Sequence, residues 1–155
     1  MSYDIYLNNP ETGEVSKVSS YLMTGGTVPC RIVDGKLVQA VQTDAWINIT
    51  YNYAKYYYAV TEGDERFAHT GSASGEVDYG IRGIYGKTGA ESIQLLQLMI
   101  DRIHDRYIYS NGKLLDARET DTSDYWKPTA ANAIRPLRQM ISLAEQCPDS
   151  VWDGD

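Results

Sequence analysis

Two hydrophobic periodicities divide the chain, and together they restrict its fold more than any other sequence feature. In residues 45–53, apolar side chains alternate with polar ones, which is the spacing of a half-buried strand. In residues 90–103, apolar side chains recur every three or four positions, which is the spacing of an amphipathic helix. Strand signals therefore precede helix signals. This order predicts an α+β domain, in which an antiparallel β-sheet from the N-terminal half carries two α-helices from the C-terminal half on one face.

Further strand signals surround the central one. Asp34-Gly35 lies between two apolar runs and predicts a hairpin, because both central positions of such a turn need positive φ. Residues 55–60 contain three tyrosines and are compatible with either an extension of the central strand or a short helix. The other strands are expected at 3–7, 15–18, 30–33 and 36–38.

The two helices have recognisable starts. Thr88 and Glu91 form a capping-box pattern, which predicts a helix that runs to about residue 106. Thr129 can cap a second helix, in which Pro136 requires either a kink or a start near Asn132. Between the helices, Ser110-Asn111-Gly112 predicts a turn that is either a helix exit or a small hairpin. The whole chain, 1–155, is expected to be a single domain with mobile loops near 62–79 and 116–124.

Charge and composition exclude several classes of function. The net charge of −7, from 21 acidic and 14 basic side chains, argues against direct nucleic-acid binding and against an anionic membrane surface. No apolar run is long enough for a membrane helix, and the N-terminus lacks a signal-peptide pattern, so a cytoplasmic location is expected. Cys30 and Cys147 are expected to be reduced thiols, and no Cys/His spacing indicates a metal or a cofactor.

The segment 80–89 has the composition of an anion site. Its Gly-Lys-Thr end resembles a phosphate-binding loop, but Ile81 occupies a position where that motif needs glycine, so an ATPase is rejected. A glycine-rich loop that enters a helix N-terminus still offers free amides to a phosphate or a carboxylate. The alternative is an ordinary capped helix start with solvated bases. The ligand-binding candidates here are Arg82, Tyr85, Lys87 and Thr88.

The segment 124–132 has the same features before the second helix: aromatic side chains, a basic side chain and a capped helix start. If the two helix N-termini lie side by side, they would form one positive, aromatic-walled pocket in an acidic protein, which suits a nucleotide. The alternative is that the tryptophan packs in the core. The candidates are Trp126, Lys127, Thr129, Asn132 and Arg135.

A row of small polar side chains on the central strand, Asn48, Thr50 and Asn52, either lines a site or is simply a solvated face. No catalytic residue is predicted, because no pattern indicates a nucleophile and its base. The sequence favours binding over catalysis.

Six segments carry a resemblance to known proteins: 1–7 (MSYDIYL), Gly25-Gly26-Thr27, 46–53 (WINITYNY), 80–92, 124–129 (DYWKPT) and 149–155 (DSVWDGD). Through these segments, most of the chain resembles a group of small proteins from phages and mobile elements of Gram-positive bacteria. The resemblance carries over no catalytic residue, and the chain departs from it at 28–42, 62–79 and 107–121. It implies a product made in the bacterial host cytoplasm, in a class of accessory proteins that often counteract host defence.

The leading hypothesis is a phage accessory protein that antagonises host immunity as a sponge for a nucleotide-type signal. Arg82, Lys87, Lys127 and Arg135 would hold phosphates, and Tyr85 and Trp126 would stack on bases. The pocket is expected to be completed by a second subunit in a homodimer. A weaker alternative is a nucleotide-degrading enzyme.

Another alternative is an acidic, anti-CRISPR-like protein that imitates nucleic acid and inhibits a host defence protein directly. It requires one continuous patch from six carboxylates: Asp101, Asp105, Asp116, Glu119, Asp121 and Asp124.

Overall fold

The computed structural model describes residues 1–19, 30–39, 42–71 and 75–155. The Gly25-Gly26-Thr27 element and residues 72–74 of the expected polar loop lie outside the described residues. No helix in the described ranges is both long and apolar enough to cross a membrane.

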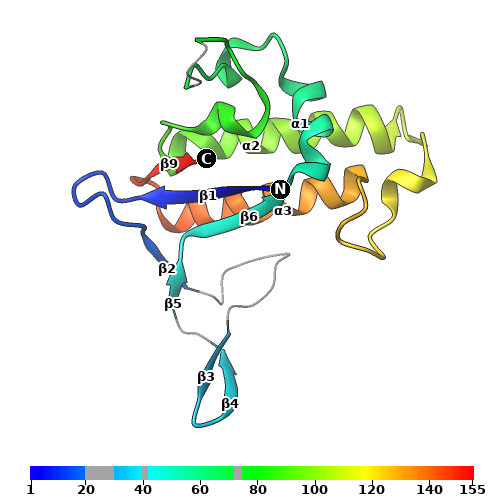
Figure 1. The fold of residues 1–155 in the computed structure, drawn as a ribbon. Coiled ribbons are helices and arrows are strands. Elements are labelled where there is room, and N and C mark those ends of the chain that lie inside the picture. The colour runs from blue at the N-terminus through cyan, green and yellow to red at the C-terminus, as the bar shows by residue number, and fades with distance from the viewer. Residues whose placement is uncertain (20–29, 40–41, 72–74) are drawn as a thin grey trace.

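A three-stranded antiparallel sheet forms the centre of the molecule (Figure 1). Its strand order is β6 (Trp46–Thr50), β1 (Ser2–Asn8), β9 (Val151–Gly154). The alternating side chains Tyr3, Ile5 and Leu7 of β1 are buried, as expected for a strand with one face on the core. The helices α2 (Gly89–Ile103) and α3 (Ala130–Gln146) lie behind this sheet, so the α+β fold class is confirmed.

The two long helices are antiparallel neighbours. At the start of α2, the Gly89 amide donates to the Ser150 carbonyl at 2.8 Å, just beyond the end of α3. A Cβ on Gly89 would lie 2.4 Å from the Cys147 carbonyl oxygen, so only glycine allows this close approach. The capping box of Thr88 and Glu91 is confirmed, and α3 contains Pro136 in its interior.

A short helix, α1 (Ala54–Thr61), follows β6 through a 3-10 helix at Tyr51–Tyr53. The alternation had predicted a strand as far as residue 53, and its last three positions are wrong. The Thr50 side chain accepts a hydrogen bond from the Asn52 amide at 3.3 Å and so caps a helical turn where the strand pattern continues in sequence. The tyrosines at 56 and 57 are fully buried, so α1 belongs to the core.

Short elements complete the chain. A π-helix, His104–Ile108, extends α2, and the turn at Asn111-Gly112 is a hairpin between β7 (Tyr109–Ser110) and β8 (Lys113–Leu114). In the first half, β2 (Lys17–Ser19) pairs with β5 (Gln42–Asp44). The Asp34-Gly35 hairpin is also confirmed: it joins β3 (Cys30–Val33) to β4 (Lys36–Gln39), with φ of +50° and +72° at the turn.

Both expected polar loops contain ordered turns. A 3-10 helix at Glu65–Phe67 buries Phe67 completely, and His69 forms an antiparallel bridge with Asp78. Another 3-10 helix spans Ala117–Thr120. Phe67 therefore anchors the described part of the first loop to the core.

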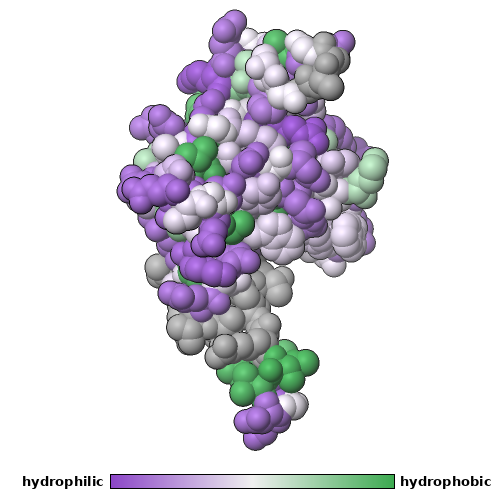
Figure 2. Space-filling model, turned by 60° about the vertical axis from the view of Figure 1, so that its left-hand side comes forward, coloured by the Kyte–Doolittle hydropathy of each residue, from purple (hydrophilic) through white to green (hydrophobic). Residues whose placement is uncertain are grey.

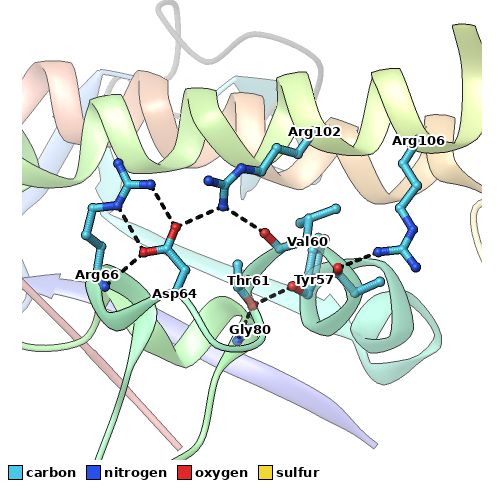
Figure 3. Close-up of polar contacts among 9 residues, drawn as sticks. Tyr57, Val60, Thr61, Asp64, Arg66, Gly80, Arg102 and Arg106 are labelled. Carbon is cyan, nitrogen blue, oxygen red and sulfur yellow. Dashed lines mark hydrogen bonds and ion pairs between the residues drawn. The ribbon is translucent and has the colours of Figure 1, made fainter. Parts of the chain in front are cut away.

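Arginines from α2 and the turn after it satisfy the carbonyls at the end of α1 (Figure 3). Arg102 donates to the Val60 carbonyl at 2.9 Å and to the Asp64 carboxylate at 3.0 Å, and Arg66 donates to the same carboxylate at 2.7 Å. Arg106 donates to the Ala59 carbonyl at 2.6 Å. Cations at a helix C-terminus are favourable because the free carbonyls carry partial negative charge.

This junction predicts an acid sensitivity. Hydrogen bonds from Arg66, together with Arg102, hold the pKa of Asp64 well below its ordinary value of 3.8. The Asp64 carboxylate is therefore harder to protonate in the folded state than in the unfolded chain. Its contribution to the free energy of unfolding is fully present well above pH 3.8 and is lost as the pH falls below that value. We expect the stability difference between wild type and Asp64→Asn to shrink from about pH 6 to about pH 3 in urea unfolding. A difference that is constant over this range would contradict the prediction.

Candidate functional site

The expected site residues Arg82 and Tyr85 lie together beside the end of β9. The Arg82 Nε donates to the Asp155 backbone oxygen at 2.9 Å, and its guanidinium lies 3.6 Å from the Asp78 carboxylate. It also lies over the Tyr3 ring, 5.0 Å from the centroid. Arg82 is thus already surrounded by protein partners.

A cavity of about 420 Å³ opens next to this arginine. Its lining includes the carboxylates of Asp78, Asp153 and Asp155, which would repel a phosphate. Burial raises the pKa of the Tyr85 hydroxyl well above its usual range, so this group stays neutral. The cavity is therefore a poor site for an anion, although it contains two of the expected ligand-binding residues.

The amides at the start of α2 are not free. Gly89 and Ala90 donate to the carbonyls of Ser150 and Pro148, and Glu91 donates to the Thr88 hydroxyl. The Glu91 carboxylate accepts from the Thr88 amide at 2.9 Å. The expectation that this N-terminus offers free amides to a phosphate is therefore wrong. Lys87 lies separately, in a shallow cavity lined in part by Glu65, Arg66 and Glu91.

The segment before α3 forms a hydrogen-bonded turn against α1. The Asn132 side chain donates to the carbonyls of Asp124 and Lys127 at 2.8 and 3.0 Å. Asn52 donates to the Trp126 carbonyl at 2.9 Å. The polar groups of Asn132 and Asn52 therefore hold the backbone of the turn.

The N-terminus of α3 is occupied by a carboxylate of the protein. Glu119 accepts hydrogen bonds from the Ala130 amide at 2.7 Å and from the Tyr56 hydroxyl at 2.6 Å. The Thr129 hydroxyl accepts from the Asn132 amide, and Lys127 pairs with Asp121 at 2.7 Å. A bound phosphate would have to displace Glu119, so this helix start is not an open anion site.

The expected composite pocket between two helix N-termini does not form. The helices α2 and α3 are antiparallel, so the start of α2 lies at the end of α3. A 15-residue helix is about 22 Å long, and this length separates the two N-termini. The segments that contain Arg82 and Trp126 therefore lie near opposite ends of the α2–α3 helix pair and do not share a pocket.

The expected polar row of Asn48, Thr50 and Asn52 does not form a site either, and only its first two members lie on β6. Thr50 is only 3% exposed and caps the following turn. Asn48 lies on the exposed face, where its amide donates to Ser2 Oγ and to Asp4 Oδ1 at 2.8 and 2.7 Å. Since Asn52 contacts the Trp126 turn, the three residues have three separate environments.

A different cavity, which we call the basic pocket, combines positive charge with an apolar floor. It has a volume of about 400 Å³ and lies between α3 and the π-helix that follows α2. Neither guanidinium on its wall, Arg135 or Arg138, makes a hydrogen bond or an ion pair to the described residues. The full lining is His104, Ile108, Thr122, Ala131, Ile134, Arg135 and Arg138.

One residue of this pocket was predicted from the sequence. Arg135 was a candidate, but Arg138 and His104 were not. The spacing of Arg135 and Arg138, three residues apart, places both on one face of α3 and was visible in the sequence. His104 could not be joined to them, because it follows a different helix.

Three of the six carboxylates of the nucleic-acid-mimic alternative pair with arginine or lysine, or cap a helix, within the protein. Asp116 pairs with Arg118 and Asp121 with Lys127, each at distances below 3 Å. Glu119 caps α3. Two of the six are thus neutralised by bases and one is used structurally, which weakens the case for a continuous acidic surface.

The described ranges contain neither a metal-binding cluster nor a reactive thiol. No three His, Cys, Asp or Glu side chains there are placed to hold a metal ion. The Cys147 thiol is buried, and burial raises its pKa, which suppresses the reactive thiolate. The side chain of Cys30 lies outside the described residues.

Comparisons of the chain with protein families, with curated proteins and with solved structures found no match.

Proposed function

We propose that this chain is a binding protein that holds a nucleotide-type anion in the basic pocket and thereby withdraws a signalling molecule. The observation that carries the proposal is the pair of guanidinium groups, Arg135 and Arg138, which make no hydrogen bond and no ion pair with the described residues. They line a cavity in a protein whose net charge is −7. Unpaired arginines at a cavity are suited to an anionic ligand.

The chemistry of the pocket fits the two parts of a nucleotide. A guanidinium can donate two parallel hydrogen bonds to a phosphate, which makes arginine the preferred side chain for such groups. Ile108, Ile134 and Ala131 supply an apolar surface for a base. The volume of about 400 Å³ lies within the range of roughly 300–1,000 Å³ that is usual for small-molecule sites.

The biological role follows from the resemblance to phage proteins noted in the sequence. In that setting the protein acts in the bacterial host cytoplasm, and its ligand is a nucleotide signal of a defence system. Binding without turnover removes the signal while leaving it chemically intact. A nucleotide-degrading enzyme would use the same pocket but release a product.

Substitutions on α3 test this proposal. We expect Arg138→Glu to weaken retention of the tightest ligand from a panel of linear and cyclic nucleotides by about 10-fold or more, since a charge-assisted hydrogen bond is lost and a repulsive charge is added. Equilibrium dialysis measures the change. Arg118→Glu is the matched control, because Arg118 is 90% exposed and does not line the pocket.

The bound molecule is then released by heat and identified by mass spectrometry. An intact nucleotide supports sequestration, whereas a converted product supports the enzyme. If wild type retains no nucleotide from the panel, or if both arginine variants weaken binding equally, the proposed function is wrong.

A further inference from the structure

The hairpin of β3 and β4, residues 30–39, projects from the rest of the molecule (Figure 1). We call it the arm. Its aliphatic side chains are largely in solvent: Ile32 is 76% exposed, Leu37 is 75% exposed, and Val33 and Val38 are each 40% exposed. Figure 2 shows an apolar band on this projection, next to a hydrophilic tip.

The register of the arm places apolar side chains on both of its faces. Ile32 lies directly opposite Leu37, so this pair shares one face. Val33 and Val38 lie opposite Lys36 and Arg31 and point to the other face. A hairpin that packs one face on its own protein and exposes the other to solvent would have apolar side chains on one face only.

An isolated two-stranded hairpin is marginally stable in water, and unpaired strand edges promote association. Together the four aliphatic residues expose roughly 400 Å² over the two faces of the arm, which is comparable to the largest apolar patch of a typical monomer, and such patches are often functional. A second copy of the chain is an occupant that is present in equal amount wherever the arm is exposed.

Charge and area favour the same occupant. The arm carries Arg31 and Lys36 against Asp34, so it is net positive within a chain of net charge −7. The arm of one copy and the acidic remainder of another are therefore complementary. If each of two arms buries its roughly 400 Å² of apolar surface against an equal area of the other copy, the two contacts together bury about 1,600 Å², the usual size of a stable interface.

We propose that two copies of this chain form a homodimer by reciprocal exchange of the arm, each arm lying against the body of the other copy. A contact between the two arms alone would bury one face of each and about a third of that area, which is small for a stable dimer. Exchange covers both faces and uses the charge difference between arm and body. The proposal is independent of the nucleotide ligand.

Sedimentation equilibrium tests the proposal. We expect wild type to have twice the monomer mass of 17.4 kDa, and we expect the double variant Ile32→Asp, Leu37→Asp to sediment as a monomer that keeps the far-ultraviolet circular dichroism spectrum of the folded chain. The matched control is Leu114→Asp, Leu115→Asp, whose side chains are 47% and 49% exposed and lie outside the arm. This control should remain dimeric.

Cross-linking of a mixture of isotopically light and heavy protein distinguishes exchange from simple contact between arms. We expect links between copies that join Lys36 to lysines outside the arm. Links only between the two Lys36 residues would overturn the exchange. A monomeric wild type would overturn the homodimer and leave a foreign protein as the occupant of the arm, and a dimer that survives the arm substitutions would place the interface elsewhere.

Discussion

Replacing Trp152 with alanine is expected to lower the free energy of unfolding by about 3–5 kcal/mol, the range for removing a buried aromatic side chain. Trp152 is 1% exposed and lies on β9, opposite Leu7 of β1. Its indole Nε1 donates to Ser92 Oγ at 2.7 Å, and Ser92 in turn donates to the Gly89 carbonyl at 2.8 Å. The substitution would leave a cavity where the sheet meets the first turn of α2.

Urea unfolding followed by far-ultraviolet circular dichroism measures this loss without relying on tryptophan fluorescence. Trp126→Ala is the matched control, because it makes the same chemical change at a side chain that is 61% exposed. We expect the control to lose less than about 1 kcal/mol. Equal losses in the two variants would show that Trp152 does not support the core as the fold implies.

The position of Trp152 also shows which parts of the fold are readable in the sequence. Local patterns predicted the alternating strand β6, the capping box of α2 and the turn at Asp34-Gly35, because each depends on residues close together in the chain. The strand β9 was missed. Its pairing partner β1 lies at the other end of the chain, as in the pair Ile5 and Gly154, and four residues carry too little periodicity to indicate a strand.

Helix α1 was left ambiguous for a different reason. Tyrosine favours strands by propensity, so residues 55–60 carried both signals. Burial of Tyr56 and Tyr57 against the core, with the Tyr57 hydroxyl donating to the Ala133 carbonyl at 2.9 Å, accompanies the helical conformation. These contacts join residues more than 70 positions apart and cannot be derived from local spacing.

The candidate site illustrates the same limit. Sequence composition marked both helix N-termini as anion sites, and the capping role of Glu91 was recognisable from its spacing. The closing of α3 by Glu119 was not recognisable, because that carboxylate reaches the helix from a separate 3-10 turn. Conversely, the basic pocket depends on the meeting of α3 with the turn after α2, which places His104 beside Arg135.

The second large effect is expected for Asn132→Asp, which should lower the free energy of unfolding by about 3–5 kcal/mol at neutral pH, as for an uncompensated buried charge. Asn132 is fully buried, and its amide donates to the carbonyls of Asp124 and Lys127. Its Oδ1 has no hydrogen-bond partner in the described part of the chain. A carboxylate here would face two carbonyl oxygens with no donor.

The cost should depend on pH in a defined direction. Burial disfavours the ionised form and raises the pKa of the introduced carboxyl in the folded state, so protonation at low pH relieves part of the penalty. We therefore expect the stability difference from wild type to be smaller at about pH 5 than at about pH 8. Asn52→Asp is the control: this exposed amide donates to the Trp126 carbonyl of the same turn, and its loss should cost less than about 1 kcal/mol. If the two variants lose equal stability, or if the Asn132→Asp deficit does not change with pH, the buried amide is not what holds the turn before α3.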